Sequence, residues 1–218
     1  MYAQAPFLAP IANALLPPAG QSSRHPARRH LVGDYPVDQA ALDHFNRLLA
    51  KLHHVPLACD QLATAARELI DQPRAAARYP GPIAQRLELA GRIDRMVTDH
   101  DWTPDHQAAE VAHLVADYLH STDMLIPASV PAVGHLDDAI LVDAAWPQLA
   151  DEVACYQDYC RLRAIEAELR GCEAESMPFS RDDWQRARAL EAELIAHCRR
   201  SGSSSYLPGQ GPALFRVS

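Results

Sequence analysis

Histidines and carboxylates recur along one predicted helix, residues 104–121, at spacings of four, three, four and three residues. This spacing puts them on one helical face, and the five are His106, Glu110, His113, Asp117 and His120. A carboxylate and an imidazole three residues apart are a ligand pair that metal sites in helical bundles use. The opposite face is apolar, so the stripe is also what an amphipathic helix presents to water. The sequence favours the solvated face, because no second Glu-x-x-His occurs, and it leaves a metal or proton-linked role open.

Two adjacent aspartates, Asp137 and Asp138, begin the next predicted helix after a proline-punctuated connection. Pro127 and Pro131 fix their own φ and push the residues before them toward extended conformations, and Gly134 permits the turn back. Carboxylates in the first turn of a helix can accept its unpaired N–H groups and interact favourably with the positive end of the helix dipole. A structural role at a helix start therefore accounts for all five residues without catalysis.

A metal cluster is the alternative for the same aspartates. Together with Asp123, and with His113 and His120 of the preceding helix, Asp137 and Asp138 offer oxygen and nitrogen ligands for a divalent cation. The protein would then be a metal-binding protein or a metal-dependent hydrolase. The chain contains no Gly-x-Ser-x-Gly elbow, phosphate-binding loop, His-Glu-x-x-His motif or dinucleotide fingerprint. Catalytic residues are therefore unassigned, and no cofactor is expected apart from that open divalent metal.

Residues 118–163 resemble the YkvA-type domain of unknown function. The resemblance rests on the pattern Leu-Ile-Pro-x-x-x-Pro-x-x-Gly-x-x-Asp-Asp-Ala at 125–139 and on Tyr-Gln-Asp-Tyr-Cys-Arg at 156–161. In the family this core is a short helical hairpin. The family has an acidic residue just before Leu-Ile-Pro and another after the first proline, whereas this chain has Met124 and Ala128 at those positions. The resemblance implies a helical hairpin and no particular reaction, since no activity is established for the family. Some relatives are membrane-associated, so a peripheral membrane protein is a further hypothesis, although the acidic residues of this stretch make insertion costly.

The predicted architecture is an all-α bundle of about seven helices, because the periodic segments have helical spacing and no convincing alternating strand is found. Pro147 is expected to kink or restart the helix that contains it. The expected helices cover residues 37–54, 57–71, 83–99, 104–121, 137–146, 147–170 and about 181–200.

Local signals predict where several of these helices begin and end. Thr103-Pro104 has the pattern of an N-cap followed by proline at the first helical position. Gly171 is a natural left-handed cap for the helix before it. Ser180 followed three residues later by Asp183 resembles a capping box and is expected to open the last helix.

One all-α domain is expected over residues 34–200, between two flexible arms. Residues 1–33 are rich in proline and alanine, and residues 201–218 resemble a Ser/Gly-rich linker. Within the domain, Arg-Ala-Ile-Glu-Ala-Glu-Leu at 163–169 is echoed by Arg-Ala-Leu-Glu-Ala-Glu-Leu at 188–194. Strong helix formers make such echoes common, so they indicate a helical hairpin and not a duplicated domain.

Composition narrows the class of protein. The 218 residues carry a formal net charge of −8, which argues against nucleic acid as a partner because affinity for phosphates comes largely from Lys and Arg. Five cysteines without a Cys-x-x-Cys pair indicate free thiols in a reducing, bacterial-type cytoplasm. Residues 1–23 carry no charged side chain, but Pro6, Pro10, Pro17 and Pro18 interrupt them, so they lack the continuous apolar helix of roughly 20 residues that a membrane span needs. The leading hypothesis is a non-catalytic protein-interaction or structural module whose partner is a protein, with a homodimer among the candidates.

Overall fold

The computed structural model describes residues 31–71 and 79–205, with side chains described as far as residue 200. The chain divides into two compact units, Met1–Asp158 and Tyr159–Ser218. The single domain expected over residues 34–200 includes parts of both units and stays a prediction. Most of the two predicted arms lies outside the described residues. The described ends of the two arms belong to regular elements. Leu31–Val32 form a strand, and the last helix continues to Ser205.

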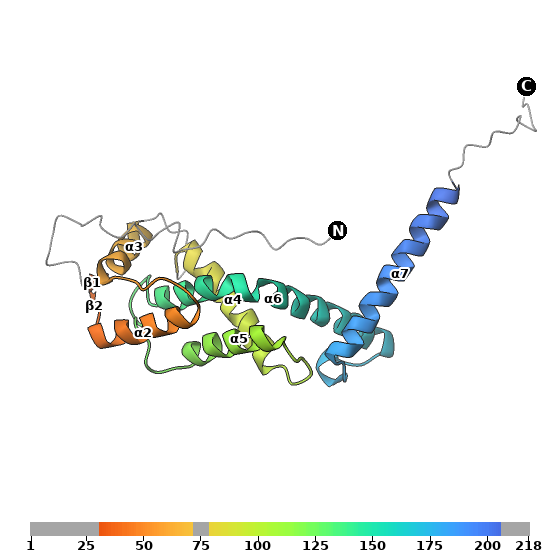
Figure 1. The fold of residues 1–218 in the computed structure, drawn as a ribbon, viewed down its shortest axis with the longest axis horizontal. Coiled ribbons are helices and arrows are strands. Elements are labelled where there is room, and N and C mark those ends of the chain that lie inside the picture. Colours follow the sequence, from red (N-terminus) through yellow and green to blue (C-terminus); the bar gives the residue numbers. More distant parts are fainter. Residues whose placement is uncertain (1–30, 72–78, 206–218) are drawn as a thin grey trace, which may run out of the picture. The chain divides into compact units, whose positions relative to one another are not determined.

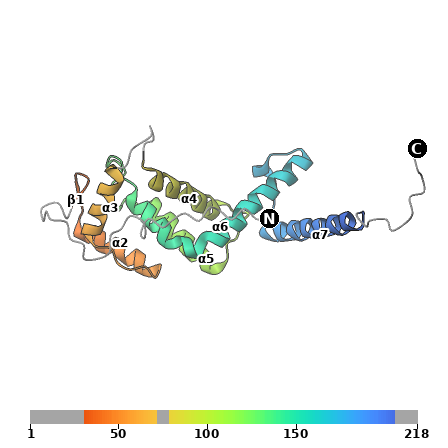
Figure 2. The same cartoon turned by 90° about the horizontal axis from the view of Figure 1, so that it is seen from above.

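The first unit begins with a small hairpin and continues with helices. Strands β1 (Leu31–Val32) and β2 (Tyr35–Pro36) pair antiparallel, with Val32 opposite Tyr35. The helices are α2 (Gln39–Lys51), α3 (Cys59–Asp71), α4 (Gly81–Thr98), α5 (His106–Leu119) and the first part of α6 (Leu136–Arg170). In Figures 1 and 2, α2 to α5 gather around that first part of α6. The predicted all-α class is confirmed, with six α-helices in the described residues instead of about seven.

The difference in number comes from α6, which runs through Pro147 as one helix of 35 residues. Proline removes one helical hydrogen bond and crowds the preceding turn, yet here it does not end the helix. Nine of the ten residues from Leu136 to Ala145 are buried, and Asp143 is half-buried. A helix that is buried all round forms the centre of a core. This packing holds α6 on the N-terminal side of the proline.

The N-cap of α5 differs from the one that the sequence predicts. Asp105 is the N-cap of α5, and its carboxylate accepts a hydrogen bond from the backbone N–H of Gln107 at 3.1 Å. The predicted start at Thr103-Pro104 is therefore two residues too early. Aspartate is a better N-cap than threonine, so the helix begins at the stronger signal.

The second unit holds the end of α6, a short 3-10 turn (Ala174–Ser176) and α7 (Arg181–Ser205). Gly171 has a φ of +67° and ends α6, as predicted. Ser180 and Asp183 form the predicted capping box, because the Ser180 N–H donates to the Asp183 carboxylate at 2.9 Å and the Asp183 N–H to the Ser180 hydroxyl at 3.3 Å. The Ser180 hydroxyl, which also donates to this carboxylate, holds the pKa of Asp183 below its ordinary value.

The connection from α6 to α7 bonds back onto α6. The Tyr159 hydroxyl donates to the carbonyl of Phe179 at 2.7 Å, and the Arg163 guanidinium donates to the carbonyl of Met177 at 3.2 Å. The two echoing segments do not bury each other's leucines, since Leu169 is 77% exposed and Leu194 is 62% exposed.

Candidate functional site

The first aspartate of α6 fastens the loop that precedes the helix. Oδ2 of Asp137 accepts hydrogen bonds from the Tyr118 hydroxyl at 2.6 Å and from the Ile126 backbone N–H at 3.1 Å. The Tyr118 oxygen in turn accepts the Leu125 backbone N–H at 3.0 Å. Asp137 is fully buried, so α5, the loop and α6 are joined through one carboxylate and one phenol. The aspartate stands in the first turn, as predicted, but its carboxylate binds the loop.

The second aspartate is bound to a histidine on the same turn. Asp138 is also buried, and its Oδ2 lies 2.6 Å from Nδ1 of the half-buried His135. The His135 ring meets the Tyr79 ring edge-on, with centroids 5.1 Å apart. In the part of the chain that the structure describes, the Oδ1 atoms of both Asp137 and Asp138 are buried without a hydrogen-bond partner. Two buried acceptors without donors are costly when the carboxylates are charged.

Burial therefore changes the proton affinity of this group. Burial raises the pKa of Asp137 to about 6, with a further contribution from the charge of Asp138, while the hydrogen bonds from Tyr118 and Ile126 act in the opposite direction. Burial also raises the pKa of Asp138, and the His135 side chain opposes that rise. The pKa of Tyr118 is raised by burial and by the neighbouring Asp137. The pair retains a proton to higher pH than exposed aspartates do.

Glycine is required in the loop because other backbone comes close to it. A Cβ built on Gly134 would lie 2.7 Å from the carbonyl oxygen of Ala128 and 2.8 Å from that of Val130. The predicted role of Gly134 as a turn residue thus has a steric cause, the close approach of the loop to itself. Pro127 and Pro131 lie in the same loop, between α5 and α6.

The five predicted metal ligands are not gathered at one place. Asp137 and Asp138 are buried, whereas Asp123 and His113 are exposed. His120 is exposed and pairs through Nε2 with Asp94 at 2.8 Å. Among the described residues there is no group of three or more His, Cys, Asp or Glu side chains placed to hold a metal ion.

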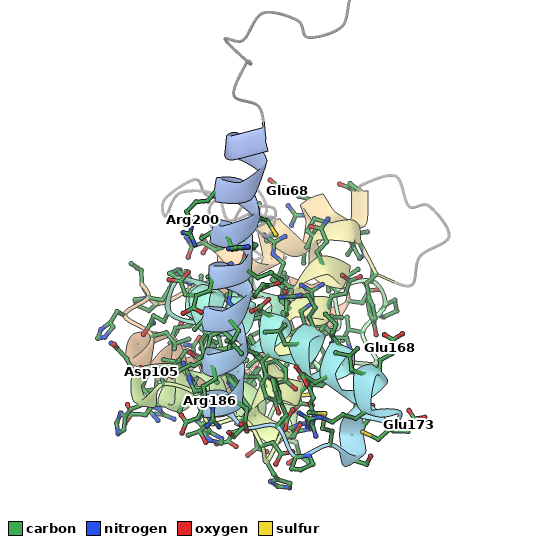
Figure 3. The ribbon with its side chains drawn as sticks, turned by 90° about the vertical axis from the view of Figure 1, so that its right-hand side faces the viewer. Glu68, Asp105, Glu168, Glu173, Arg186 and Arg200 are labelled. Carbon is green, nitrogen blue, oxygen red and sulfur yellow. The ribbon has the colours of Figure 1, made fainter. Side chains whose placement is uncertain are left out.

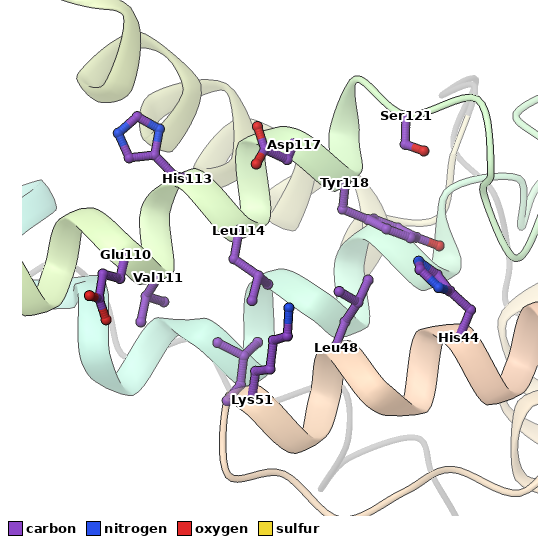
Figure 4. Close-up of a pocket in the computed structure, with 11 residues that line it drawn as sticks. His44, Leu48, Lys51, Glu110, Val111, His113, Leu114, Asp117, Tyr118 and Ser121 are labelled. Atoms are coloured by element: carbon purple, nitrogen blue, oxygen red, sulfur yellow. The ribbon is translucent and has the colours of Figure 1, made fainter.

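The stripe on α5 lies on the surface of the first unit. All of its members are exposed, namely His106, Glu110, His113, Asp117 and His120. Three of them line a groove of about 750 Å³ between α2 and α5, which Figure 4 shows with Lys51 and His44 on the α2 side and Asp117 on the α5 side. Leu48 and Leu114 form apolar parts of its walls. Tyr118 also lines the groove, while its hydroxyl bonds to Asp137.

Two contributors to this region were missed from the sequence. Tyr118 completes the acid pair, and the one available signal was its place at the start of the family-like stretch. Arg86 of α4 forms a buried ion pair with Asp143 of α6, with Nε and Oδ1 2.9 Å apart. The two residues are 57 positions apart, so no local spacing connects them.

The arrangement holds the loop before α6, because Asp137 bonds to Tyr118 and Ile126 and Asp138 bonds to His135. Both carboxylates are buried. Within residues 31–71 and 79–205, no helix combines the length and the apolar character needed to cross a bilayer.

Comparison with known proteins gives the chain no family. No protein-family model matches it, and neither a curated protein nor a solved structure matches it. The resemblance of residues 118–163 to the YkvA-type domain therefore stays a prediction.

Proposed function

We propose that this protein is a non-catalytic module that acts through protein–protein contact, and that its partner is a second copy of itself. The observation that carries the proposal is the distribution of exposed large apolar side chains. Six such residues occur among those whose side chains are described, and five belong to the second unit: Ile165, Leu169, Leu190, Leu194 and Ile195. The sixth, Val55, belongs to the first unit.

The repeated sequence favours a second copy over an unrelated partner. The echo extends over Arg161–Leu169 and Arg186–Leu194, and it places an exposed apolar pair, four residues apart, on each helix. Basic residues precede each pair and glutamates lie between and beside its members. A surface that carries both charges around matched apolar pairs can complement itself, as an isologous dimer interface requires.

The buried acid pair supports the non-catalytic part of the proposal. Asp137 bonds to the preceding loop and to Tyr118, and Asp138 bonds to His135. The carboxylates thus stabilise the conformation of the α5–α6 connection through hydrogen bonds. Loops are where binding and catalytic residues tend to occur, but here the connection is fixed from inside by buried groups.

Sedimentation velocity of the full chain between about 1 and 100 μM tests the proposal. The wild type is expected to form dimers in this range, and Leu169→Glu combined with Leu190→Glu is expected to be monomeric, because a buried glutamate without a partner is costly. Val55→Glu is the matched control, since it changes an equally exposed apolar residue of the first unit and should leave the dimer intact. A wild type that stays monomeric at 100 μM would refute self-association.

A further inference from the structure

Helix α7 has no buried residue from Arg181 to Arg200. Its exposed apolar residues are large, with Leu190 66% and Leu194 62% exposed. Helices in proteins derive most of their stability from packing an apolar face against something else. Helix α7 has 25 residues and is on the order of 37 Å long, and its described side chains are all exposed or half-buried. Its exposed leucines therefore indicate an uncovered contact face.

Three exposed residues on α7 and the half-buried Ala187 have the spacing of a coiled-coil seam. Ala187, Leu190, Leu194 and His197 follow one another at three, four and three residues, which are the spacings of successive a and d positions. Leu190 then occupies a d position, where leucine favours two-stranded pairing. We propose that α7 pairs in parallel with α7 of a second copy, through this seam. The proposal rests on the self-association proposed above and assigns it to one helix.

Charge decides the direction of pairing. In this register Glu191 is at e, and Arg186 is at g of the preceding heptad. In a parallel pair, a g residue faces the e residue five positions later on the other helix, so Arg186 faces Glu191 of the second copy. Symmetry forms this pair twice. Side chains of both residues are accessible, with 72% of Arg186 and 36% of Glu191 exposed.

The antiparallel alternative has like charges in contact. Stacking Leu190 on Leu194 of an antiparallel copy brings Arg186 beside Arg200 of that copy, and Glu193 beside its own equivalent. Figure 3 labels Arg186 near the beginning of α7 and Arg200 toward its end. Like-charge juxtaposition across an interface suppresses a pairing mode. The parallel arrangement avoids both contacts.

Contacts already present within the chain are compatible with this pairing. Glu191 accepts hydrogen bonds from Arg161 at 3.2 Å and from Arg188 at 3.4 Å. A carboxylate offers about four lone-pair sites, so a further guanidinium can be accommodated. Arg186 bonds to Asp183 at the first turn of its own helix, and this contact is exposed, so exchanging it costs little.

Disulfide trapping tests the seam and its direction in the full chain. The background replaces Cys155, Cys160, Cys172 and Cys198 by serine and keeps the buried Cys59. Single cysteines are then placed on the seam, as Ala187→Cys or His197→Cys. Equivalent seam positions of a parallel pair lie opposite each other, close enough for a disulfide. Matched controls are Ala189→Cys, which is exposed, and Ala196→Cys, which is half-buried; both lie on the same helix outside the seam.

Under mild oxidation the seam cysteines are expected to form covalent dimers at least about tenfold faster than the controls. The double variant Leu190→Glu, Leu194→Glu should raise the dimer dissociation constant about a hundredfold or more. Arg186→Glu should raise it about tenfold. Arg199→Glu changes a residue outside the seam and its flanks, so it should change the dissociation constant less than about twofold.

The outcomes separate the two proposals. A monomeric wild type overturns both self-association and the α7 seam. A wild-type dimer in which seam and control cysteines cross-link equally slowly overturns the seam alone, and self-association then uses another surface. A dimer in which Ala187→Cys fails to link to itself but links to His197→Cys in a mixture overturns the parallel direction.

Discussion

Replacing Asp137 by Asn tests the account of the buried acid pair most directly. Asn keeps an oxygen that can accept the hydrogen bonds now given by Tyr118 and Ile126. Its amide nitrogen takes the place of the unpartnered Oδ1, and the side chain is neutral at every pH. The variant thus removes the buried charge and preserves the connection between the loop and α6.

The expected effect depends on pH in a defined direction. Burial raises the pKa of Asp137 in the folded protein to about 6 from an ordinary value of 3.8. Below pH 3.8 the carboxyl is protonated in both folded and unfolded states, and the wild type has its full stability. As pH rises from 3.8 to about 6, the unfolded state releases the proton first, so the free energy of unfolding falls. Above about 6 the loss is complete. At about 1.4 kcal/mol per pKa unit, it amounts to about 3 kcal/mol.

Urea denaturation followed by circular dichroism at pH 4.0 and at pH 7.5 measures this effect. Both pH values avoid the pI of about 5.7, at which the net charge is near zero and proteins precipitate most readily. The difference in free energy of unfolding between Asp137→Asn and the wild type should shift by about 2–3 kcal/mol in favour of Asn between the two pH values. Asp123→Asn, which changes an exposed acid of the same loop, should show no such shift.

Two results would contradict the reasoning. Equal pH dependence in the wild type and in Asp137→Asn would show that this carboxyl does not carry a burial penalty. A loss of wild-type stability on adding chelator, abolished by the Asn substitution, would show that the carboxylate binds a cation, because a neutral amide replaces an anionic ligand.

Substitutions in three further places test other parts of the fold by urea denaturation. Gly134→Ala should cost about 1–3 kcal/mol, because its Cβ would press on two backbone carbonyls; an unchanged midpoint would contradict the close approach. Arg86→Leu should cost about 3–5 kcal/mol, because it removes the guanidinium that faces the Asp143 carboxylate, whose side chain is 7% exposed. Adding Asp143→Leu should restore most of the loss, and equal loss in the single and double variants would contradict this. His53 is exposed and has a φ of +59° after α2. His53→Gly should therefore raise the free energy of unfolding by up to about 1 kcal/mol, and a lower urea midpoint would count against backbone strain at this position.

Local physics made much of the fold predictable from the sequence. Helical periodicity, the cap at Gly171 and the capping box at Ser180 involve residues within one or two turns of each other. Interactions of this kind depend on chain neighbours and act wherever the chain folds. The solvated stripe on α5 was predicted for the same reason, since a 3.6-residue period identifies both faces of a helix.

Tertiary structure decided the roles of the residues that carry charge inside the protein. The sequence placed Asp137 and Asp138 at a helix start, but only packing shows that both are buried and that Tyr118 and Ile126 bind the first. Burial depends on the surface of every neighbouring element, and it determines whether an acid is an ordinary cap or a group with a raised pKa.

The same distinction explains one expectation that the structure changed and one contact that the sequence did not predict. A restart of the helix at Pro147 was one of two expectations there, and it is wrong, because α6 continues through the proline with its preceding turns buried. The ion pair of Arg86 and Asp143 joins residues 57 positions apart. Sequence determined which segments are helical and where most of them end, because those preferences are local. Only the folded chain determined which polar groups lose water, because desolvation is a property of the assembled core.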